Sequence, residues 1–240
     1  MLNNFQFRRL QPELMDDLQI DKGLHRQALS GLRRINWWSR PDTVFWNALA
    51  PLFASQPHGK QLSVLDIATG GGDVAIRLAQ RAREAGKNLE IVGCDMSPTA
   101  VEYATEQAAE AGLTNVRFQL CNVLTDPLPE PEFDVVMCSL FLHHLNENDG
   151  VVLLKRMKSA ARRLVLIDDL RRSAAGYWLA WIGCRILTRC HIVHVDGPIS
   201  VEGALTVSEA VGMAEKAGFS GVRCRRHWPQ RYLLSWTPQA

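Results

Sequence analysis

The fold is decided by residues 64–73, which read VLDIATGGGD. An apolar run that ends in three glycines and continues into a helical pattern predicts a buried strand, a tight turn and a helix. Glycine lets such a turn bend sharply and lets its backbone approach a ligand, and the first helical turn presents free N–H groups. The segment therefore predicts a ligand site at the carboxyl end of a strand in an α/β sheet.

Strand and helix patterns alternate around this segment. Apolar runs predict strands at residues 63–68, 90–94, 116–121, 133–138 and 163–167, with helices at 73–83, 98–111 and 150–161. This alternation predicts βαβ units and a parallel sheet that helices cover on both sides. Two final runs, at residues 222–228 and 232–237, predict an antiparallel hairpin at the carboxyl terminus.

Two regions lie outside this alternation. Residues 1–58 are expected to form a helical N-terminal cap, with helices from Pro12, at 24–35 and at 42–53, where Asp42 is the expected N-cap. Residues 59–240 are expected to form the ligand-binding domain, with a lid insert at about 173–205. Within the insert, residues 173–189 predict an apolar helix and residues 191–203 a connection that contains glycine and proline.

Composition limits the class of protein. Of the 240 residues, 47% are apolar and 22% are charged, which is typical of a globular chain and excludes a disordered or fibrous one. Twenty-seven Lys and Arg against 25 Asp and Glu leave a formal charge of +2, which does not indicate a nucleic-acid-binding protein. The longest apolar run, residues 174–184, is shorter than the about 18 residues of a membrane span, so no integral membrane segment is expected.

The six cysteines predict reduced thiols, because none of them forms a CxxC pair and several lie in apolar runs. A cytoplasmic location is therefore expected. No three residues have a clear metal-ligand spacing, so no metal is expected.

Two acidic residues indicate the kind of ligand. Asp66 lies inside an apolar strand, where a carboxylate is costly unless it accepts hydrogen bonds or faces a cation. Asp95 ends the second predicted strand, where a carboxylate can accept hydrogen bonds from the hydroxyls of a ribose. Met96 beside it offers a soft apolar surface to a purine. Together they predict a nucleoside-type ligand.

Two classes of nucleoside cofactor compete for this site. The spacing Gly70-x-Gly72-x-x-Ala75 can be taken as a dinucleotide fingerprint, which alone is a weak signal. Against an NAD(P)-linked oxidoreductase, Asp66 would face a pyrophosphate, and the chain contains no Tyr-x-x-x-Lys pair.

These segments resemble a known family. Residues 66–72, DIATGGG, are similar to motif I of the class I S-adenosylmethionine (SAM) methyltransferases, Asp/Glu-x-Gly-x-Gly-x-Gly. Asp95 and Met96 match the acidic residue after the second strand and its neighbour. Residues 133–145, FDVVMCSLFLHHL, are similar to the motif after strand four in the small-molecule branch. The resemblance covers about residues 60–170 and implies a Rossmann-like, seven-stranded, mostly parallel sheet with SAM as cofactor.

The resemblance also implies a set of SAM contacts. These are Asp66, Ala68, Gly70, Gly72, Asp95, Met96, Asn122, Val123, Cys138 and Ser139, the last two through backbone atoms. Two positions depart from the family pattern. Ala68 replaces the first glycine of motif I, and the close approach of the backbone to the ligand is expected to survive there if φ is negative. Asn122 replaces an aspartate near the adenine amino group, and its side-chain carbonyl can accept the same hydrogen bond.

The acceptor of the methyl group is expected to be a small apolar or aromatic molecule. Residues 138–141, CSLF, differ from the Asn/Asp-Pro-Pro-Tyr/Phe tetrapeptide of enzymes that methylate amino groups of DNA and protein. Aromatic residues outside the cofactor core are expected to form an apolar lid over the methyl group. They are Trp37, Trp38, Tyr177, Trp178 and Trp181, with Trp46 nearby in sequence. O-methylation of a phenol, quinol or polyketide, as in secondary metabolism, fits such a pocket best.

A base is expected because a phenolic hydroxyl has a pKa of about 10. The candidates are His143 and His144, which face the methyl group in the resemblance, and His191 and His194, which lie close to Asp196 in the lid. Asp168 and Asp169 offer a further acid–base site.

Several alternatives stay open at this point. They concern the methylated atom, the histidine that acts as the base, and the oligomeric state, for which a homodimer is one option. A non-catalytic SAM-binding module and an oxidoreductase are the alternative functions.

Overall fold

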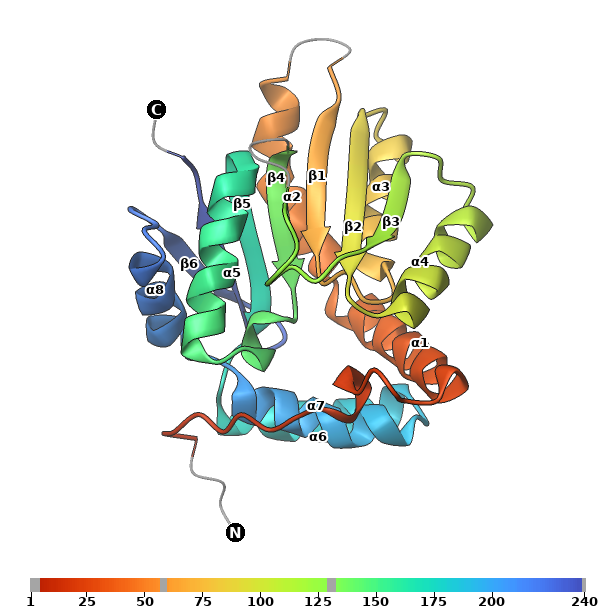
Figure 1. The fold of residues 1–240 in the computed structure, drawn as a ribbon, viewed down its shortest axis with the longest axis vertical. Helices are drawn as coiled ribbons and strands as arrows, with labels where there is room; N and C mark the ends of the chain where they lie inside the picture. Colours follow the sequence, from red (N-terminus) through yellow and green to blue (C-terminus); the bar gives the residue numbers. More distant parts are fainter. Residues whose placement is uncertain (1–4, 57–59, 129–132, 239–240) are drawn as a thin grey trace.

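A seven-stranded sheet forms the centre of the protein (Figure 1). The computed structural model describes residues 5–56, 60–128 and 133–238. The strand order is β3-β2-β1-β4-β5-β7-β6. Strand β7 pairs antiparallel with both β5 and β6, and the other neighbouring pairs are parallel, which confirms the predicted fold. The strands are β1 (Leu62–Ile67), β2 (Leu89–Asp95), β3 (Val116–Leu120), β4 (Phe133–Ser139), β5 (Ala161–Leu170), β6 (Arg223–His227) and β7 (Arg231–Trp236).

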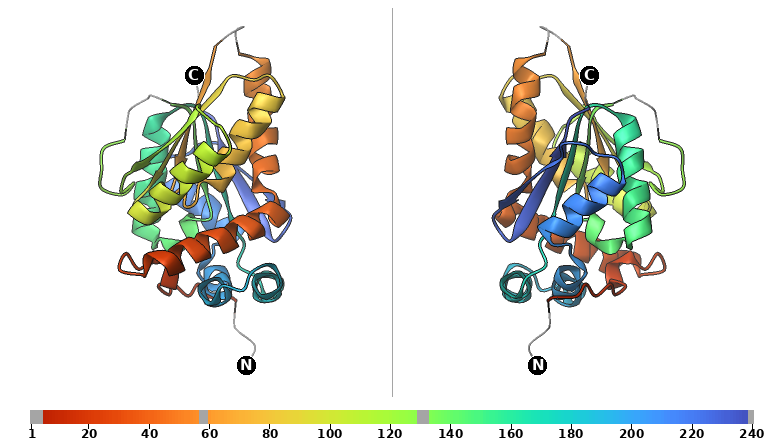
Figure 2. Two further views of the ribbon diagram at one scale, coloured as in Figure 1. Left: turned by 90° about the vertical axis from the view of Figure 1, so that its right-hand side faces the viewer. Right: turned by 90° about the vertical axis from the view of Figure 1, so that its left-hand side faces the viewer.

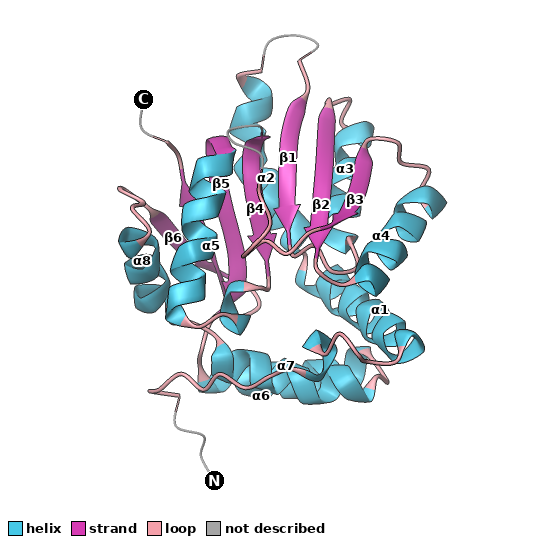
Figure 3. Cartoon of the chain, in the orientation of Figure 1, coloured by secondary structure: helices cyan, strands magenta, loops and turns pink. Residues whose placement is uncertain are grey.

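Helices cover both faces of the sheet and one of its ends (Figures 2 and 3). Helices α2 and α3 lie on one face, α4 lies beside β3, and α5 and α8 lie on the other face. Helices α1, α6 and α7 lie across the carboxyl ends of the parallel strands. The helices are α1 (Lys22–Ser39), α2 (Pro41–Ala54), α3 (Asp73–Glu84), α4 (Pro98–Glu110), α5 (Glu147–Ala160), α6 (Ala174–Leu187), α7 (His191–Gly203) and α8 (Val207–Lys216), with short 3₁₀ turns η1 (Leu14–Asp16) and η2 (Leu142–His144).

The central strands are buried because side chains of both faces reach a core. On β1, Val64 packs in one hydrophobic cluster with α2 and α3, whereas Leu65 and Ile67 pack in another with α5 and α8. Successive side chains of a strand point to opposite faces, so an uninterrupted apolar run supplies both cores. No helix among the described residues is long and apolar enough to cross a membrane.

Local signals fix helix α1 and its junction with α2. Asp21 caps α1, accepting a hydrogen bond from the Leu24 N–H at 3.0 Å. Arg40 ends α1 in the left-handed conformation, and Pro41 then starts α2 at a position where a missing N–H costs nothing. Asp42 was expected to cap α2, but it lies inside the first turn and is paired with Arg77.

Two other expectations about secondary structure are wrong. The helix predicted from Pro12 is only the 3₁₀ turn η1, and the connection predicted at residues 191–203 is helix α7. Pro198 is accommodated inside α7, where Arg185 donates to the carbonyl of His194, the group that Pro198 cannot bond. The predicted boundary between residues 58 and 59 lies outside the described residues.

Candidate active site

A cavity of about 500 Å³ lies at the carboxyl ends of β1, β2 and β4. Residues of η1, α1, α6 and α7 close it on the side away from the sheet. One part of its wall is polar and contains the glycine-rich turn. The other part is apolar and comes from the three helices. The polar residues include Glu13, Asp16, His25, Asn36, Asp66, Asp73, Asp95, Asn122, Ser139, His143, His144 and Arg231.

Asp66 lies under the glycine-rich turn and is 2% exposed. Its Oδ2 accepts a hydrogen bond from the Thr69 hydroxyl at 2.6 Å. Burial raises the pKa of Asp66 to about 7, although the Thr69 hydrogen bond acts in the opposite direction. Ala68 lines the cavity with a φ of +52°, so the condition set for close approach at this position, a negative φ, is not met. The backbone has the left-handed conformation that the family's glycine would adopt more easily.

Asp95 joins the end of β2 to the glycine-rich turn. Its Oδ2 accepts from the Gly70 N–H and its Oδ1 from the Ser97 N–H, both at 2.9 Å. Each oxygen keeps a second lone pair, so the carboxylate can also accept from two ribose hydroxyls. Met96 lies beside it at the cavity wall and is 48% exposed, as a surface for a purine requires.

The remaining predicted SAM contacts divide into two groups. Asn122, Val123 and Ser139 line the cavity, and the Asn122 side-chain oxygen accepts from the Leu124 N–H at 3.0 Å. Gly72 and Cys138 do not line it. Cys138 is fully buried in the hydrophobic core, and Gly72 lies against other side chains at the start of α3.

Besides Nε of Arg231, two buried polar atoms of cavity-lining residues have no hydrogen-bond partner among the described residues. They are Oδ2 of Asp73, in the first turn of α3, and Oγ of Ser139, at the end of β4. A buried polar atom without a partner costs free energy, so both atoms are suited to a polar ligand. The residues present therefore fit a SAM molecule whose adenosine lies at Asp95 and whose amino acid portion lies near these two atoms.

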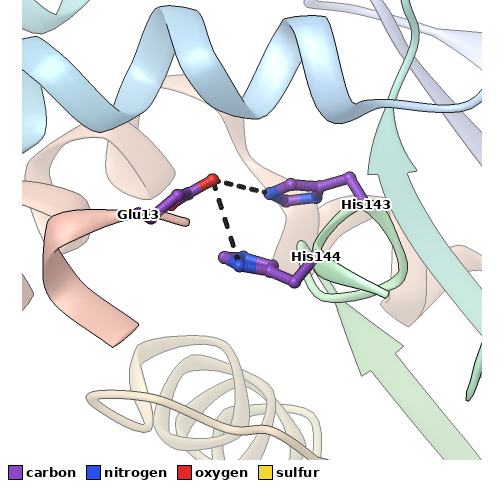
Figure 4. Close-up of side chains that lie close together, drawn as sticks. All are labelled: Glu13, His143 and His144. Carbon is purple, nitrogen blue, oxygen red and sulfur yellow. Dashed lines mark ion pairs between the residues drawn. The ribbon is translucent and has the colours of Figure 1, made fainter. Parts of the chain in front are cut away.

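Two of the four candidate histidines meet Glu13 at the cavity wall (Figure 4). Oε1 of Glu13 lies 3.6 Å from Nε2 of His143 and 3.9 Å from Nδ1 of His144. Two histidines and a glutamate whose donor atoms lie within 4.8 Å of one another are a set of groups that can hold a metal ion. In this conformation Glu13 Oε1 also accepts from the Ser200 hydroxyl at 2.6 Å.

His143 is held by Asp169. The ring Nδ1–H donates to Asp169 Oδ1 at 2.6 Å, and the backbone N–H donates to Oδ2 at 3.0 Å. Burial alone would lower the pKa of His143, but the carboxylates of Asp169 and Glu13 raise it to about 10. These two carboxylates therefore favour the protonated form of His143, which makes it a poorer candidate for the base than His144.

His144 has the arrangement of a base. Its Nδ1–H donates to Asp16 Oδ2 at 2.7 Å, which leaves Nε2 as the nitrogen that can accept a proton. Its side chain is 17% exposed and lines the cavity.

The two histidines of α7 lie elsewhere. His191 is exposed at the first residue of α7, and Nε2 of His194 donates to the Thr188 carbonyl at 2.8 Å. Asp196 accepts from the backbone N–H groups of Leu14 and Met15 instead of a histidine. The His–Asp pair expected in the lid is absent from the described residues, and neither histidine lines the cavity.

Among the predicted aromatic lid residues, only Trp38 lines the cavity. Trp37 is 65% exposed and borders a separate surface groove. Tyr177 packs against Phe5, and Trp178 and Trp181 point outward at 55% and 39% exposure. Trp46 packs against Phe53 on α2. Aliphatic side chains from three helices take their place at the wall, namely Leu32, Ile35, Leu179, Leu187, Val193 and Val201.

The sequence did not predict Glu13, Asp16 or Asp73 as residues of the cavity, nor that Asp169 holds His143. Glu13 and Asp16 precede α1 by several residues, and no local pattern connects them to residues 143 and 144. Asp168, also considered for acid–base chemistry, instead holds the fold by pairing with Arg231 at 2.9 Å and with His227 at 2.6 Å.

Comparison with known sequences gives a consistent assignment. Residues 58–170 match the family model described as "Methyltransferase domain". Demethylmenaquinone methyltransferase of Deinococcus radiodurans is 36% identical over 106 residues, which are 44% of this chain and 42% of that protein. The Thermus thermophilus protein of the same name is 34% identical over 106 residues, 44% of this chain and 46% of that protein. The matched part thus spans less than half of these relatives.

Solved structures share the fold. The O-methyltransferase family 2 protein of Planctomyces limnophilus in complex with apigenin has a TM-score of 0.64 at 17% identity, covering 92% of this chain and 63% of that one. Magnesium protoporphyrin IX methyltransferase of Synechocystis with bound S-adenosylhomocysteine has a TM-score of 0.55 at 16% identity, covering 90% and 84%. Residues 58–170 thus match a methyltransferase domain, and the structure places the residues of motif I and Asp95 at one cavity.

Proposed function

We propose that the protein transfers a methyl group from SAM to a hydroxyl of a small apolar aromatic molecule such as a phenol or quinol. One observation carries this proposal: His144, with Nδ1 fixed by Asp16, lines a cavity that also contains the glycine-rich turn and an aliphatic wall. A base, a cofactor site and an apolar compartment are the parts that this reaction needs.

The chain's own residues would position the cofactor. Asp95 would accept from the ribose hydroxyls, Met96 and Val123 would contact the adenine, and Asp73 and Ser139 would bond the amino acid portion. When bound, SAM would supply a methyl group on a positively charged sulfur, and its S–CH₃ bond would break as the bond to the acceptor formed. Proximity and alignment of the two reactants would supply most of the acceleration.

His144 would take the proton of the acceptor hydroxyl on Nε2. The Asp16 carboxylate holds the tautomer that makes this possible and stabilises the imidazolium that results. His143 has another part in this proposal. As a buried cation beside the cavity, it would stabilise the negative charge that develops on the acceptor oxygen.

C-methylation is the second candidate, and the relatives favour it. Two of them are named demethylmenaquinone methyltransferase, and others are named ubiquinone/menaquinone biosynthesis C-methyltransferase. Removal of a proton from a hydroquinol hydroxyl activates both its oxygen and the ring carbon beside it. The same base would therefore serve either reaction, and the orientation of the ring would decide the product.

The test is a turnover assay with SAM and a panel of phenols and hydroquinols, with products identified by mass spectrometry. His144→Asn is expected to slow transfer by about 10²–10⁴-fold while SAM affinity stays the same. His194→Asn is the matched control, because this histidine bonds a backbone carbonyl away from the cavity. Equal turnover of the two variants would remove His144 from the reaction.

A further inference from the structure

Helix α6 presents an apolar face to solvent. Trp178, Trp181, Ile182 and Ile186 are 55%, 39%, 46% and 76% exposed. Their spacing of three and four residues places them on one side of the helix. Surface helices of globular proteins direct such a side toward the core, so this orientation is the reverse of the usual one. Large exposed apolar patches mark interaction sites.

Neighbouring residues extend this face and make it basic. Trp37 of α1, 65% exposed, borders one groove together with Ile186, Arg33 and Arg34. On α6 itself, Arg185 lies 4.0 Å above the ring of Trp181. Residues 174–195 contain the exposed Arg185 and Arg189 and no aspartate or glutamate. Two acidic residues, Asp73 and Glu110, also border the groove, and Glu110 accepts a hydrogen bond from the Gln107 side chain.

We propose that this face, Trp37 with Trp178, Trp181, Ile182, Arg185 and Ile186, docks on the surface of an anionic phospholipid bilayer. Tryptophan and arginine beside aliphatic residues form the composition of helices that lie in the membrane interface. The 14 residues of α6 span about 21 Å, too short to cross the bilayer. The helix would lie along the membrane surface with its indole rings among the headgroups.

A second copy of the chain is a less favourable partner for this face. A two-fold symmetric contact brings the same patch of each subunit against the other. Arg185 and the arginines around it would then face their own copies, and like charges across an interface cost free energy. Anionic headgroups neutralise these charges instead.

The opposite side of α6 lines the cavity through Leu179, Gly183 and Leu187. The bilayer and the acceptor compartment would therefore be separated by one helix, which is about 10 Å thick. Docking would place the cavity where a lipid-soluble acceptor can enter it from the membrane. This last consequence rests on the proposed function, whereas the docking itself does not.

The test is flotation of the full chain with vesicles of phosphatidylcholine alone and of phosphatidylcholine with phosphatidylglycerol. We expect association with the anionic vesicles that weakens with salt. The double variant Trp178→Ser/Ile186→Ser should lose affinity for these vesicles by about tenfold or more. Arg185→Glu should also lose affinity. Val152→Ser, 42% exposed on α5, and Arg223→Glu, exposed on β6, are the matched controls and should bind like the wild type.

Circular dichroism and SAM affinity will show that each variant is folded. The proposal is overturned if the wild type does not float with anionic vesicles, or if the double variant floats equally well. It is also overturned if sedimentation shows a dimer that the double variant dissociates while vesicles are not bound. Turnover of a water-soluble phenol without vesicles tests the proposed function separately, so the two failures can be told apart.

Discussion

Two glycines of motif I are expected to respond differently to the same substitution. Gly70 and Gly72 both have positive φ, +54° and +73°. At Gly72 an added Cβ would lie 2.6 Å from the ring of Phe118 and 2.8 Å from Cβ of Ala104. At Gly70 no heavy atom of the described residues lies within 4 Å of that position. Gly72 is thus closely packed, whereas Gly70 lines the cavity.

The cost of each substitution follows from these contacts. An alanine in the left-handed conformation costs about 1–2 kcal/mol, which is the whole cost expected for Gly70→Ala. Gly72→Ala adds an overpacking cost, for a total loss of about 2–5 kcal/mol in the free energy of unfolding. SAM affinity should respond in the opposite order, because Gly70 lines the cavity and Gly72 does not.

Urea unfolding followed by tryptophan fluorescence measures the first quantity, and calorimetric titration with SAM measures the second. Ala68→Gly is a useful third variant, since Ala68 already has a φ of +52°. Glycine relieves that strain but makes the unfolded chain more flexible, so the two effects on the free energy of unfolding should offset each other. If Gly70→Ala unfolds at a lower urea concentration than Gly72→Ala, or if Gly72→Ala alone loses SAM affinity, the two glycines do not have these separate roles.

Three further predictions concern the polar part of the cavity. Because burial raises the pKa of Asp66 from 3.8 to about 7, its ionised form is disfavoured in the folded state, and the free energy of unfolding should fall as pH rises through this range. Asp66→Asn should remove that dependence in pH-dependent urea unfolding, and an unchanged profile would contradict it. Asp95→Ala should retain the fold by circular dichroism but weaken SAM binding by about 2 kcal/mol or more in calorimetry; wild-type affinity would show that the ribose lies elsewhere. Chelation with EDTA should leave turnover unchanged, because Glu13 and His144 already form hydrogen bonds with Ser200 and Asp16 through atoms that a metal would need. Loss of turnover that zinc restores would identify a metal centre.

The sheet and the cofactor side of the cavity could be predicted from the sequence because their signals are local. The apolar run of β1, the glycines after it and the acid at the end of β2 lie within short segments. Parallel strands then bring their carboxyl ends to one edge of the sheet, so local motifs are enough to assemble Asp66 and Asp95 at one cavity.

The acceptor side could not be predicted in the same way. Glu13 reaches His143 across 130 residues of sequence, and nothing near Glu13 signals that contact. Helix α6 is apolar on nearly every side, so periodicity does not tell which side faces the cavity. The structure directs the tryptophans and isoleucines of α6 outward, and Leu179 and Leu187 toward the cavity. Pro198 and two glycines likewise predicted a connection where the structure has α7. Tertiary packing of Ile192, Val193 and Val201 stabilises this helix.

In the proposed function, one cavity holds SAM and an aromatic acceptor whose hydroxyl His144 deprotonates. The most direct measurement is transfer from methyl-labelled SAM to a hydroquinol, followed by mass spectrometry, for the wild type and His144→Asn. We predict label in the hydroquinol product with the wild type and a loss of about 10²-fold or more with the variant. SAM binding without any transfer to phenols or hydroquinols, or equal transfer by the variant, would contradict the account.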